Sequence, residues 1–270
     1  MGVLLNRLLN ILNNGKTEST YYHIANILIC NYDKIKNMTI SEVAELCFVS
    51  KSTISKFTRY IGFEDFSDLK SAAGYKSNKN QNILNYNDNI LGYLDCHSVE
   101  DYINAIMKDL EDLKSNIQYN KIDELAKDLI KYKSIAAFGV LYSQSAAVDF
   151  QTKLAYNNKY IFSRIDDVKQ HEFIRNAKEN TLIIIFTNSG DYIKKYQLIG
   201  GNINKGVFKE TKAKIVAITS NKELEKSPYV DLCICFGHKS SVQTHPIIYQ
   251  VITDIIVSRY KELINNKKTW

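Results

Sequence analysis

Residues 39–57 of the chain read TISEVAELCFVSKSTISKF. Apolar side chains in this stretch recur at the spacing of two short helices, with a break near residue 48 between them. Ala44 is small enough for the two helices to cross closely, and Ser50 is a residue type that caps the start of a helix well. The side chains spaced to fill the angle between the helices are Val43, Leu46, Val49, Ile54 and Phe57. This pattern predicts a helix-turn-helix.

The second predicted helix has a polar, basic exposed face. Residues 50–61 contain three basic residues and no Asp or Glu. Lys and Arg can reach phosphates or guanine edges, and hydroxyl groups at a helix N-terminus can donate to phosphate oxygens. We therefore expect a double-stranded DNA operator as partner, contacted by Ser50, Lys51, Ser52, Thr53, Ser55, Lys56 and Arg59. The alternative is an ordinary helical hairpin whose polar side is only solvated. Phe48 occupies a turn position where many such motifs have Gly, which predicts a wider turn or a different backbone path.

Composition sets limits on the class of protein. The chain has 270 residues, 45% of them hydrophobic, which is enough for two domains with cores of their own. The net charge is +6, so DNA binding depends on where the charges lie. The five cysteines are scattered and odd in number, which argues against a disulfide framework, and Cys233 and Cys235 are expected to be a buried structural pair. No apolar run is long enough to cross a membrane, and the start lacks a signal-peptide cleavage site, so we predict a cytoplasmic protein.

The pattern of apolar residues divides the chain into two domains. Residues 1–76 read as helices throughout, 77–97 as a linker that begins polar and unpatterned, and 98–270 as the second domain. Beyond residue 121, short apolar runs typical of strands alternate with segments typical of helices. The predicted strands are 135–138, 160–165, 182–186, 215–218 and 232–236, and the predicted helices are 143–156, 167–177, 191–204 and 246–263. The chain is therefore expected to be an α/β protein, with an all-helical amino-terminal domain followed by a parallel-sheet α/β/α sandwich.

Two loops of the second domain predict a ligand site. The first follows a predicted strand and opens a helix, and the second has the same arrangement. Backbone N–H groups at a helix N-terminus, with hydroxyl groups beside them, form a neutral cradle for a phosphate dianion. Such loops meet at the carboxyl ends of parallel strands, where both can face one ligand. The candidate residues are Gly139, Ser143 and Ser145 in the first loop and Thr187, Asn188, Ser189 and Gly190 in the second.

Several segments resemble a known family. ISEVAEL at 40–46, KFTRYIGF at 56–63 and FSDLK at 66–70 resemble the amino-terminal domain of the RpiR family, which are bacterial sugar-responsive regulators. The region 122–263 resembles a SIS (sugar isomerase) domain, which in this family binds phosphosugars. The matching residues are Gly139, Ser143, Thr187, Ser189 and Gly190, together with 215–220 and 229–231. The resemblance implies a regulator of carbohydrate-metabolism genes that is controlled by a phosphorylated sugar or a related small ligand.

Three positions depart from the family's pattern. Lys56 stands where the signature has Arg, which keeps the charge but loses the bidentate fork that suits guanine. Leu141 replaces the second Gly of the first ligand loop, and Tyr192 replaces a Thr that usually helps to hold the phosphate. We expect Leu141 to narrow or displace the cradle and Tyr192 to remove a compact donor.

Two other functions are compatible with these residues. A phosphosugar aldose–ketose isomerase needs a carboxylate base and usually a His, for which His171, Glu172 and His245 are candidates. Adjacent residues on a helix point about 100 degrees apart, and polar helix positions are usually solvated, so we predict no catalytic residues. A SIS domain that serves only to dimerise is the other alternative. The five histidines are dispersed and form no metal-binding motif, so neither a metal nor a cofactor is predicted.

A helix-turn-helix needs a second copy to read two half-sites about 34 Å apart, so we predict a homo-oligomer, at least a dimer. The apolar stripes within 98–117 and 246–263 are candidates for that contact, and equally for ordinary core. Ligand binding is expected to shift the spacing of the DNA-binding domains through the 77–97 linker. Such a shift requires the ligand to bind the two spacings with different affinity.

Overall fold

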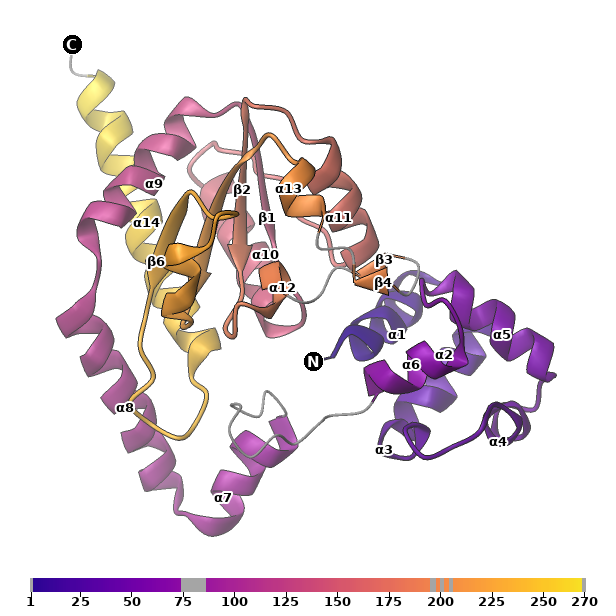
Figure 1. Ribbon diagram of the computed structural model, residues 1–270. Helices are drawn as coiled ribbons and strands as arrows, with labels where there is room; N and C mark the ends of the chain where they lie inside the picture. Colours follow the sequence, from indigo (N-terminus) through magenta and orange to yellow (C-terminus); the bar gives the residue numbers. More distant parts are fainter. Residues whose placement is uncertain (1, 74–85, 195–197, 200–201, 204–205, 269–270) are drawn as a thin grey trace.

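The computed structural model describes residues 2–73, 86–194, 198–199, 202–203 and 206–268 of the chain (Figure 1). Residues 2–73 form helices joined by turns, around a core that includes Leu4, Ile24 and Phe57. The helices are α1 (Val3–Asn14), α2 (Thr20–Cys30), α3 (Tyr32–Ile35), α4 (Ile40–Leu46), α5 (Lys51–Tyr60) and α6 (Phe66–Ala73). The prediction of an all-helical amino-terminal domain is confirmed.

The predicted helix-turn-helix consists of α4 and α5. Thr39 caps α4 with a capping box, because its hydroxyl accepts from the N–H of Glu42 and the Glu42 carboxylate accepts from the N–H of Thr39. Ser50 caps α5, and its hydroxyl oxygen lies 3.1 Å from the Thr53 nitrogen that donates to it. The caps satisfy backbone N–H groups that the first turn of a helix leaves without partners, and so fix where each helix begins.

The second domain is organised around a parallel sheet. Ala136 lies opposite Ile183 across β1 and β2, and Ile183 lies opposite Ile215 across β2 and β5. Within the described residues the sheet has four strands in the order β1-β2-β5-β6: β1 (Ser134–Phe138), β2 (Thr181–Phe186), β5 (Lys214–Thr219) and β6 (Leu232–Cys235). Nearly every strand residue is buried, as the continuous apolar runs predict for strands covered on both faces.

Two layers of helices cover this sheet (Figure 1). Ala137 and Ile184 point to one layer, and Ala136 and Ile183 point to the other, because successive strand residues face opposite sides. The first layer contains α9 (Tyr119–Lys131), α10 (Tyr142–Ala155) and α14 (His245–Lys268), and the second contains α11 (Asp167–Asn176), α12 (Asp191–Lys194) and α13 (Val207–Glu210). The predicted parallel-sheet α/β/α sandwich is confirmed.

Three predictions of local structure are corrected. Segment 160–165 meets the sheet at a single described bridge, between Phe162 and Ala136, so it is an irregular edge and not a strand. The predicted helix 191–204 ends at Lys194, and an antiparallel pair, β3 (Leu198–Ile199) and β4 (Asn202–Ile203), follows it. The sequence has a glycine pair at 200–201, which is unfavourable in a helix. Helix α9 was not predicted, although its apolar face is buried in the core.

The predicted linker 77–97 is described from residue 86 onward, and 77–85 lies outside the described residues. Its later half is helical, since a π-helix, η1 (Asn87–Leu91), runs into α7 (Gly92–Cys96). Ser98 then caps α8 (Val99–Asn116), as the sequence indicated. The domain boundaries 1–76, 77–97 and 98–270 stay predictions.

The two helices considered for self-association differ in burial. Tyr249 and Ile252 of α14 are fully buried in the core, as is most of that helix's apolar face. Helix α8 turns Asp109 and Leu113 inward instead. It leaves three apolar side chains at least half exposed, at four-residue spacing: Val99, Ile103 and Met107. The stripe of α14 is therefore core, whereas part of the α8 stripe faces outward.

Helix α1 joins the two domains through its polar face. Leu4 faces the helical core, whereas Asn6 and Arg7 are buried against the second domain. The Asn6 amide donates to the carbonyl oxygen of Ile165 at 3.0 Å. The Arg7 guanidinium pairs with the Asp167 carboxylate at 2.9 Å, and both side chains are about 5% exposed. The polar residues of α1, which are buried here, therefore hold the domains together.

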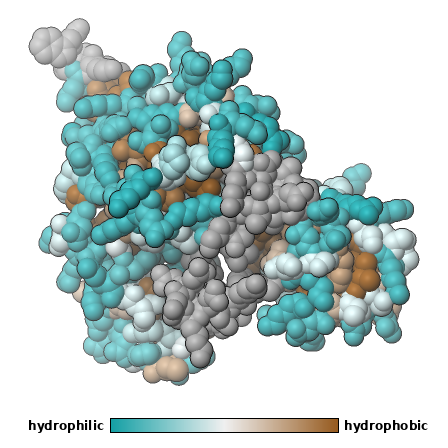
Figure 2. Space-filling view, in the orientation of Figure 1, coloured by the Kyte–Doolittle hydropathy of each residue, from teal (hydrophilic) through white to brown (hydrophobic). Residues whose placement is uncertain are grey.

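The surface seen in Figure 2 is mostly hydrophilic over the α/β domain, with hydrophobic atoms showing in small areas. No helix in the described parts of the chain is both long and apolar enough to span a membrane. Within the same residues, His, Cys, Asp and Glu side chains form no group of three that could hold a metal ion. Cys233 and Cys235 are buried on β6 with their sulfur atoms 3.4 Å apart, and both are free thiols.

Candidate functional site

The N-terminal part of α5 gathers most of the predicted DNA-contact residues. Lys51, Ser52 and Lys56 are exposed, while Ser55 is half-buried. A cluster of hydroxyl groups forms at the helix start, where the Ser50 oxygen lies 2.8 Å from the hydroxyl oxygens of both Ser52 and Thr53. This end of the helix combines hydroxyl groups, unbonded backbone N–H groups and two nearby lysines, which is a surface suited to phosphate oxygens.

Arg59 lies on the flank of this face. It stands in the last turn of α5 and lines a groove of about 1150 Å³ between the two domains. Lys16, Arg164 and Lys169 line the same groove. The structure thus places Lys51 at the start of α5, Lys56 in its middle and Arg59 in its last turn, beside the second domain.

Phe48 stands in the turn between α4 and α5. Its φ angle is 54°, the left-handed conformation that Gly adopts without a steric penalty. The turn therefore keeps a four-residue path, 47–50, and is not widened by the larger residue. The ring itself is 89% exposed.

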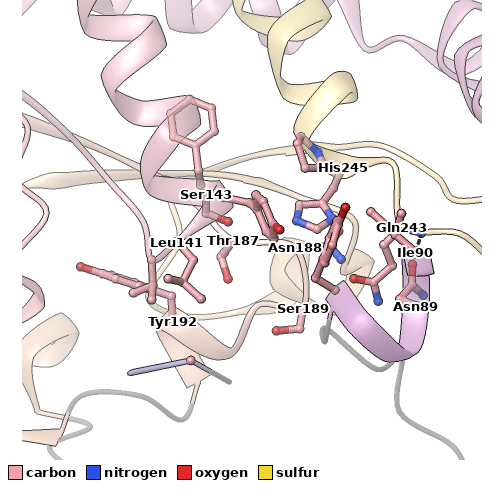
Figure 3. A pocket seen from close by; sticks show the side chains of 16 residues that line it. Asn89, Ile90, Leu141, Ser143, Thr187, Asn188, Ser189, Tyr192, Gln243 and His245 are labelled. Carbon is pink, nitrogen blue, oxygen red and sulfur yellow. Dashed lines mark hydrogen bonds between the residues drawn. The ribbon is translucent and has the colours of Figure 1, made fainter. Parts of the chain in front are cut away.

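A cavity of about 120 Å³ opens at the carboxyl ends of β1 and β2 (Figure 3). Ser143, in the first turn of α10, lines it from one side. Thr187, Asn188 and Ser189, which follow β2 directly, line it from another. Four of the seven predicted ligand residues therefore meet at one cavity.

The other three predicted ligand residues do not line this cavity. Gly139 is buried under α10, where a Cβ atom would lie 2.6 Å from the backbone carbon of Ser143, so its role is close packing of strand and helix. Gly190 has a φ angle of 79°, which requires a glycine in the turn into α12. Ser145 is exposed, and its hydroxyl donates to the carbonyl oxygen of Leu141.

The loop after β2 is fixed by the loop after β5. The carbonyl oxygen of Asn188 accepts hydrogen bonds from the hydroxyls of Thr219 at 3.1 Å and Ser220 at 2.8 Å. The carbonyl oxygen of Ser189 accepts from the Asn221 amide at 2.7 Å. These bonds fix the loop through the protein's own contacts, which reduces the conformational entropy that binding a ligand would cost.

Leu141 and Tyr192, which depart from the family's pattern in the ligand loops, shape the cavity in different ways. Leu141 has a φ angle of 54°, and its methyl carbon Cδ1 lies 2.4 Å from where a Cβ on Gly2 would be. Leu141 therefore closes one side of the cavity against the start of α1. Tyr192 contributes its ring to the lining, but its hydroxyl donates to the side-chain oxygen of Gln170 at 2.6 Å. The Tyr192 hydroxyl is thus engaged in a buried network.

The opposite wall comes from the segment between β6 and α14, which Asp109 holds in place. The Asp109 carboxylate accepts from the Thr244 hydroxyl at 2.6 Å and from the backbone N–H groups of Lys239 at 2.7 Å and Ser240 at 2.9 Å. Burial alone would raise the pKa of Asp109, but these hydrogen bonds hold that pKa below its ordinary value. An ionised Asp109 therefore fixes the segment that carries His245 to the cavity.

His245 is the titratable side chain of this wall. Burial lowers the pKa of His245 to about 3, so the imidazole is neutral near pH 7. Its Nδ1 atom is buried and has no hydrogen-bond partner among the described residues. A neutral imidazole offers one donor and one acceptor, which suits the hydroxyl groups of a ligand.

Sequence reasoning missed the residues that complete the cavity. Gly2 at the start of α1 lines it, as do Asn89 and Ile90 of η1. The Asn89 side-chain oxygen accepts from the backbone N–H of Gln243, another lining residue, at 2.8 Å (Figure 3). The start of α1 and the helix η1 of the linker therefore both reach the cavity. Neither a terminal glycine nor an asparagine in a polar linker carries a signal that could have predicted this.

The three candidate catalytic residues, His171, Glu172 and His245, do not meet at the cavity. His245 lines the cavity, but Glu172 is exposed and lines the groove between the domains. His171 is buried beside Tyr192, and burial lowers its pKa to about 4. None of the described residues that line the cavity is Asp or Glu. A carboxylate base for isomerisation therefore has no candidate among them, and His245 is the one catalytic candidate that reaches the described lining.

Residues 6–79 match the helix-turn-helix domain of the rpiR family. They are an rpiR-family helix-turn-helix domain. The resemblance inferred from 40–46 and 56–63 is confirmed. The rpiR-family domain includes α5 and the turn that contains Phe48. The polar face described above therefore lies on the second helix of its motif.

Two relatives are named as transcriptional regulators of the helix-turn-helix type. A Providencia stuartii protein, named as an HTH-type transcriptional regulator in the aarA 3' region, is 26% identical over 275 residues, which cover 98% of this chain and 93% of the relative. An HTH-type transcriptional regulator of Haemophilus influenzae is 27% identical over 136 residues, which cover 48% of this chain and 46% of the relative. The chain is thus similar over its whole length to a helix-turn-helix transcriptional regulator, and residues 6–79 are its helix-turn-helix domain.

One solved structure shares the fold over almost the full length. It is the Vibrio vulnificus NanR protein complexed with ManNAc-6P, which covers 99% of this chain and 94% of its own. The TM-score is 0.52 and the sequence identity is 14%. At this identity the likeness concerns the fold.

Proposed function

We propose that the chain regulates carbohydrate-metabolism genes by binding operator DNA through α5 and a phosphorylated sugar in the cavity at Ser143 and 187–189. The observation that carries this proposal is the composition of the cavity wall. Residues from the predicted ligand loops line it together with Gly2 of α1 and Asn89 of η1. A ligand in this cavity would therefore touch the start of α1, which belongs to the DNA-binding domain, and η1, which belongs to the linker.

A few polar groups in this largely apolar cavity suit a phosphorylated sugar. The N-terminus of α10, a helix of 14 residues, opens beside Ser143, and the side chains of Thr187 and Ser189 add hydroxyl groups. Such a neutral set of donors can hold a phosphate dianion. His245 and Gln243 on the opposite wall can bind sugar hydroxyls. NanR, which shares the fold, was solved with a phosphosugar bound, and this supports the proposed ligand class.

Coupling to DNA follows from the same contacts. A ligand that displaces Leu141 from Gly2 would change the position of α1, and one that displaces Asn89 would change the linker. The ion pair between Arg7 and Asp167 fixes α1 against the second domain. Ligand control therefore requires that the arrangements with and without these contacts bind the ligand with different affinity. The linker 77–97 is one route for this change, and α1 is a second.

The oligomeric state belongs to this proposal. The rpiR-family domain needs a second copy to read two half-sites, and the apolar residues Val99, Ile103 and Met107 of α8 are exposed. We assign this stripe to the contact between copies in a homo-oligomer, at least a dimer. We propose that the cavity binds its ligand without catalysis, because none of its described lining residues is the carboxylate base that sugar isomerisation uses.

DNA binding is tested by selecting genomic fragments on the purified protein at about 0.15 M salt, with and without a mixture of hexose, hexosamine and pentose phosphates. The expected result is a palindromic site beside sugar-metabolism genes, with enrichment changed by the mixture. The double variant Lys51→Ala/Lys56→Ala should bind the selected duplex more weakly, with a salt slope smaller by about two for each bound copy. The double variant Lys127→Ala/Lys178→Ala removes the same charge from exposed positions of the second domain and should bind normally. Equal losses in both double variants would contradict the assignment to α5.

Ligand binding is tested separately with a bulky substitution in the cavity. Ser189→Phe should abolish the stabilisation that an active phosphosugar gives in a thermal-shift assay, while affinity for the selected duplex stays normal. Ser145→Phe places the same side chain at an exposed position outside the cavity and should keep the ligand response. No thermal shift with any phosphosugar at millimolar concentration would contradict the proposed ligand class.

A further inference from the structure

Phe48 combines two features that rarely occur together. Its φ angle of 54° lies in the left-handed region, which a bulky residue adopts rarely, and its ring is 89% exposed. The backbone around it leaves no freedom to relax. The Phe48 N–H donates to the carbonyl oxygen of Glu45 at 3.0 Å, and the Val49 N–H donates to that of Ala44 at 2.9 Å. The turn is therefore fixed by hydrogen bonds, and a glycine would fit it without strain.

Nothing within the described structure makes use of the Phe48 ring. Other aromatic side chains of the same domain have clear packing roles, since Phe57 is fully buried and the exposed Tyr60 lies 4.7 Å, centroid to centroid, from the ring of Tyr21. The Phe48 ring has no such ring partner among the described residues. A large apolar group that is strained, exposed and unused in the fold is expected to contact something outside the chain.

The position of Phe48 identifies that contact. The residue lies two positions before Ser50, the cap of α5, beside the hydroxyl cluster and Lys51. In a helix-turn-helix, the N-terminal residues of the second helix reach the base edges of the major groove. The apolar atoms that DNA offers there are the methyl groups of thymine, and Phe is among the side chains that contact them.

We infer that Phe48 is a specificity-determining residue whose ring packs against a thymine methyl group of the operator. The inference rests on the proposed DNA-binding function of α5. It adds a contact that is apolar and does not depend on salt to a surface that otherwise consists of hydroxyl groups and lysines. It also gives a reason for a phenylalanine at a position where the backbone favours glycine.

The test uses the full-length protein and the duplex obtained by selection on it. Phe48→Gly should lower affinity for that duplex about 5- to 20-fold, with an unchanged salt slope, because no charge is removed. Its melting temperature should be equal to or higher than that of the parent protein, because glycine fits the turn. Tyr156→Ala removes an aromatic side chain of similar exposure, 86%, far from the turn, and should not change DNA affinity.

A second measurement identifies the atom that is contacted. Each thymine of the duplex is replaced in turn by deoxyuridine, which lacks only the methyl group. At one position the replacement should weaken binding of the parent protein about 3- to 10-fold and leave binding of Phe48→Gly unchanged. If the parent protein binds no DNA, the proposed function fails. If the parent protein binds and the variant binds equally well, or if both proteins respond equally at every deoxyuridine, the inference about Phe48 alone is overturned.

Discussion

Phe48 in the helical domain and Leu141 in the α/β domain can be compared directly. Each stands in a loop where related motifs have glycine, and each has a φ angle of 54°. Their surroundings are opposite. Leu141 is half-buried, lines the ligand cavity and packs against Gly2 of α1, whereas Phe48 is 89% exposed in the turn before α5.

The difference shows what offsets backbone strain in each case. A positive φ angle costs a non-glycine residue about 1–2 kcal/mol. For Leu141 this cost is opposed by apolar burial between two domains, so the fold itself accounts for the residue. For Phe48 the fold supplies no such burial, so the reason lies in what the turn meets outside the chain. The comparison depends on α1 remaining packed against the second domain. Disrupting that contact is therefore its strongest test.

The largest effect is expected for Arg7→Ala. This substitution leaves Asp167 buried without its charged partner, and breaking a buried pair in this way typically costs about 3–5 kcal/mol of unfolding free energy. It should also free Gly2 from Leu141, so that Leu141 loses its packing partner. Thermal and urea unfolding of the full-length protein measure the loss.

The matched control is Arg175→Ala, which breaks a pair with Glu210 at the other end of α11. Both partners of that pair are more than a third exposed, so the loss should stay below about 1 kcal/mol. Equal stability of the two variants would show that α1 does not depend on its contact with Asp167, and the comparison would lose its basis.

The second-largest effect is a pH dependence of the second domain. Burial lowers the pKa of His171 to about 4, whereas an unfolded histidine titrates near 6.5. The unfolded chain therefore binds more protons between these values, and the free energy of unfolding falls as the pH drops from 6.5 to 4. The contribution is complete above pH 6.5, and its loss is on the order of 3 kcal/mol. The amino-terminal domain has a single histidine, His23, and it is exposed, so acid should affect the Leu141 side of the molecule first.

This dependence is measured as unfolding free energy at several pH values for the parent protein and for His171→Leu. The variant should show a smaller slope between pH 6.5 and 4. His245, whose pKa burial also lowers, is present in both proteins and cancels in the difference. Parallel slopes in the two proteins would show that His171 is already protonated in the fold or never desolvated.

Local patterns predicted the elements whose positions depend on local forces. The spacing of Val43, Ile54 and Phe57 and the cap at Ser50 are properties of neighbouring residues, and the second helix of the motif begins where Ser50 indicates. Strands with continuous apolar runs were likewise predicted within one or two residues. The helix predicted at 191–204 was wrong because apolar periodicity outweighed the glycine pair within it.

The candidate site was predictable only where two loops follow adjacent parallel strands, because sheet topology brings those ends together. Four of the seven ligand residues meet at the cavity for this reason. Gly139 and Gly190 were read as ligand contacts although their backbones need glycine for packing and for a positive φ angle. The walls formed by Gly2, Asn89 and His245 depend on how distant segments dock, which no local pattern encodes. Asn6 and Arg7, polar residues on an otherwise amphipathic helix, are buried for the same reason.

The smallest effect compares the two strained positions directly, by placing glycine at each. In Phe48→Gly, relief of strain of about 1–2 kcal/mol is opposed by the greater chain entropy of glycine in the unfolded state, about 0.5–1 kcal/mol. The variant should gain up to about 1 kcal/mol. In Leu141→Gly the same two effects operate, but apolar burial is also lost, and removing a half-buried leucine costs about 1 kcal/mol more. Its stability should therefore be equal to or slightly below that of the parent protein.

Urea midpoints of the two variants, measured side by side, test this order. The difference between them reports mainly the packing of Leu141, because both positions have a φ angle of 54° and both substitutions add glycine entropy. If Leu141→Gly is the more stable variant, the Leu141 side chain is not held by its contact with Gly2, and the cavity wall there is open in solution. If Phe48→Gly loses more than about 1 kcal/mol, the Phe48 ring packs within the fold. Its exposure would then no longer support a role in contacting DNA.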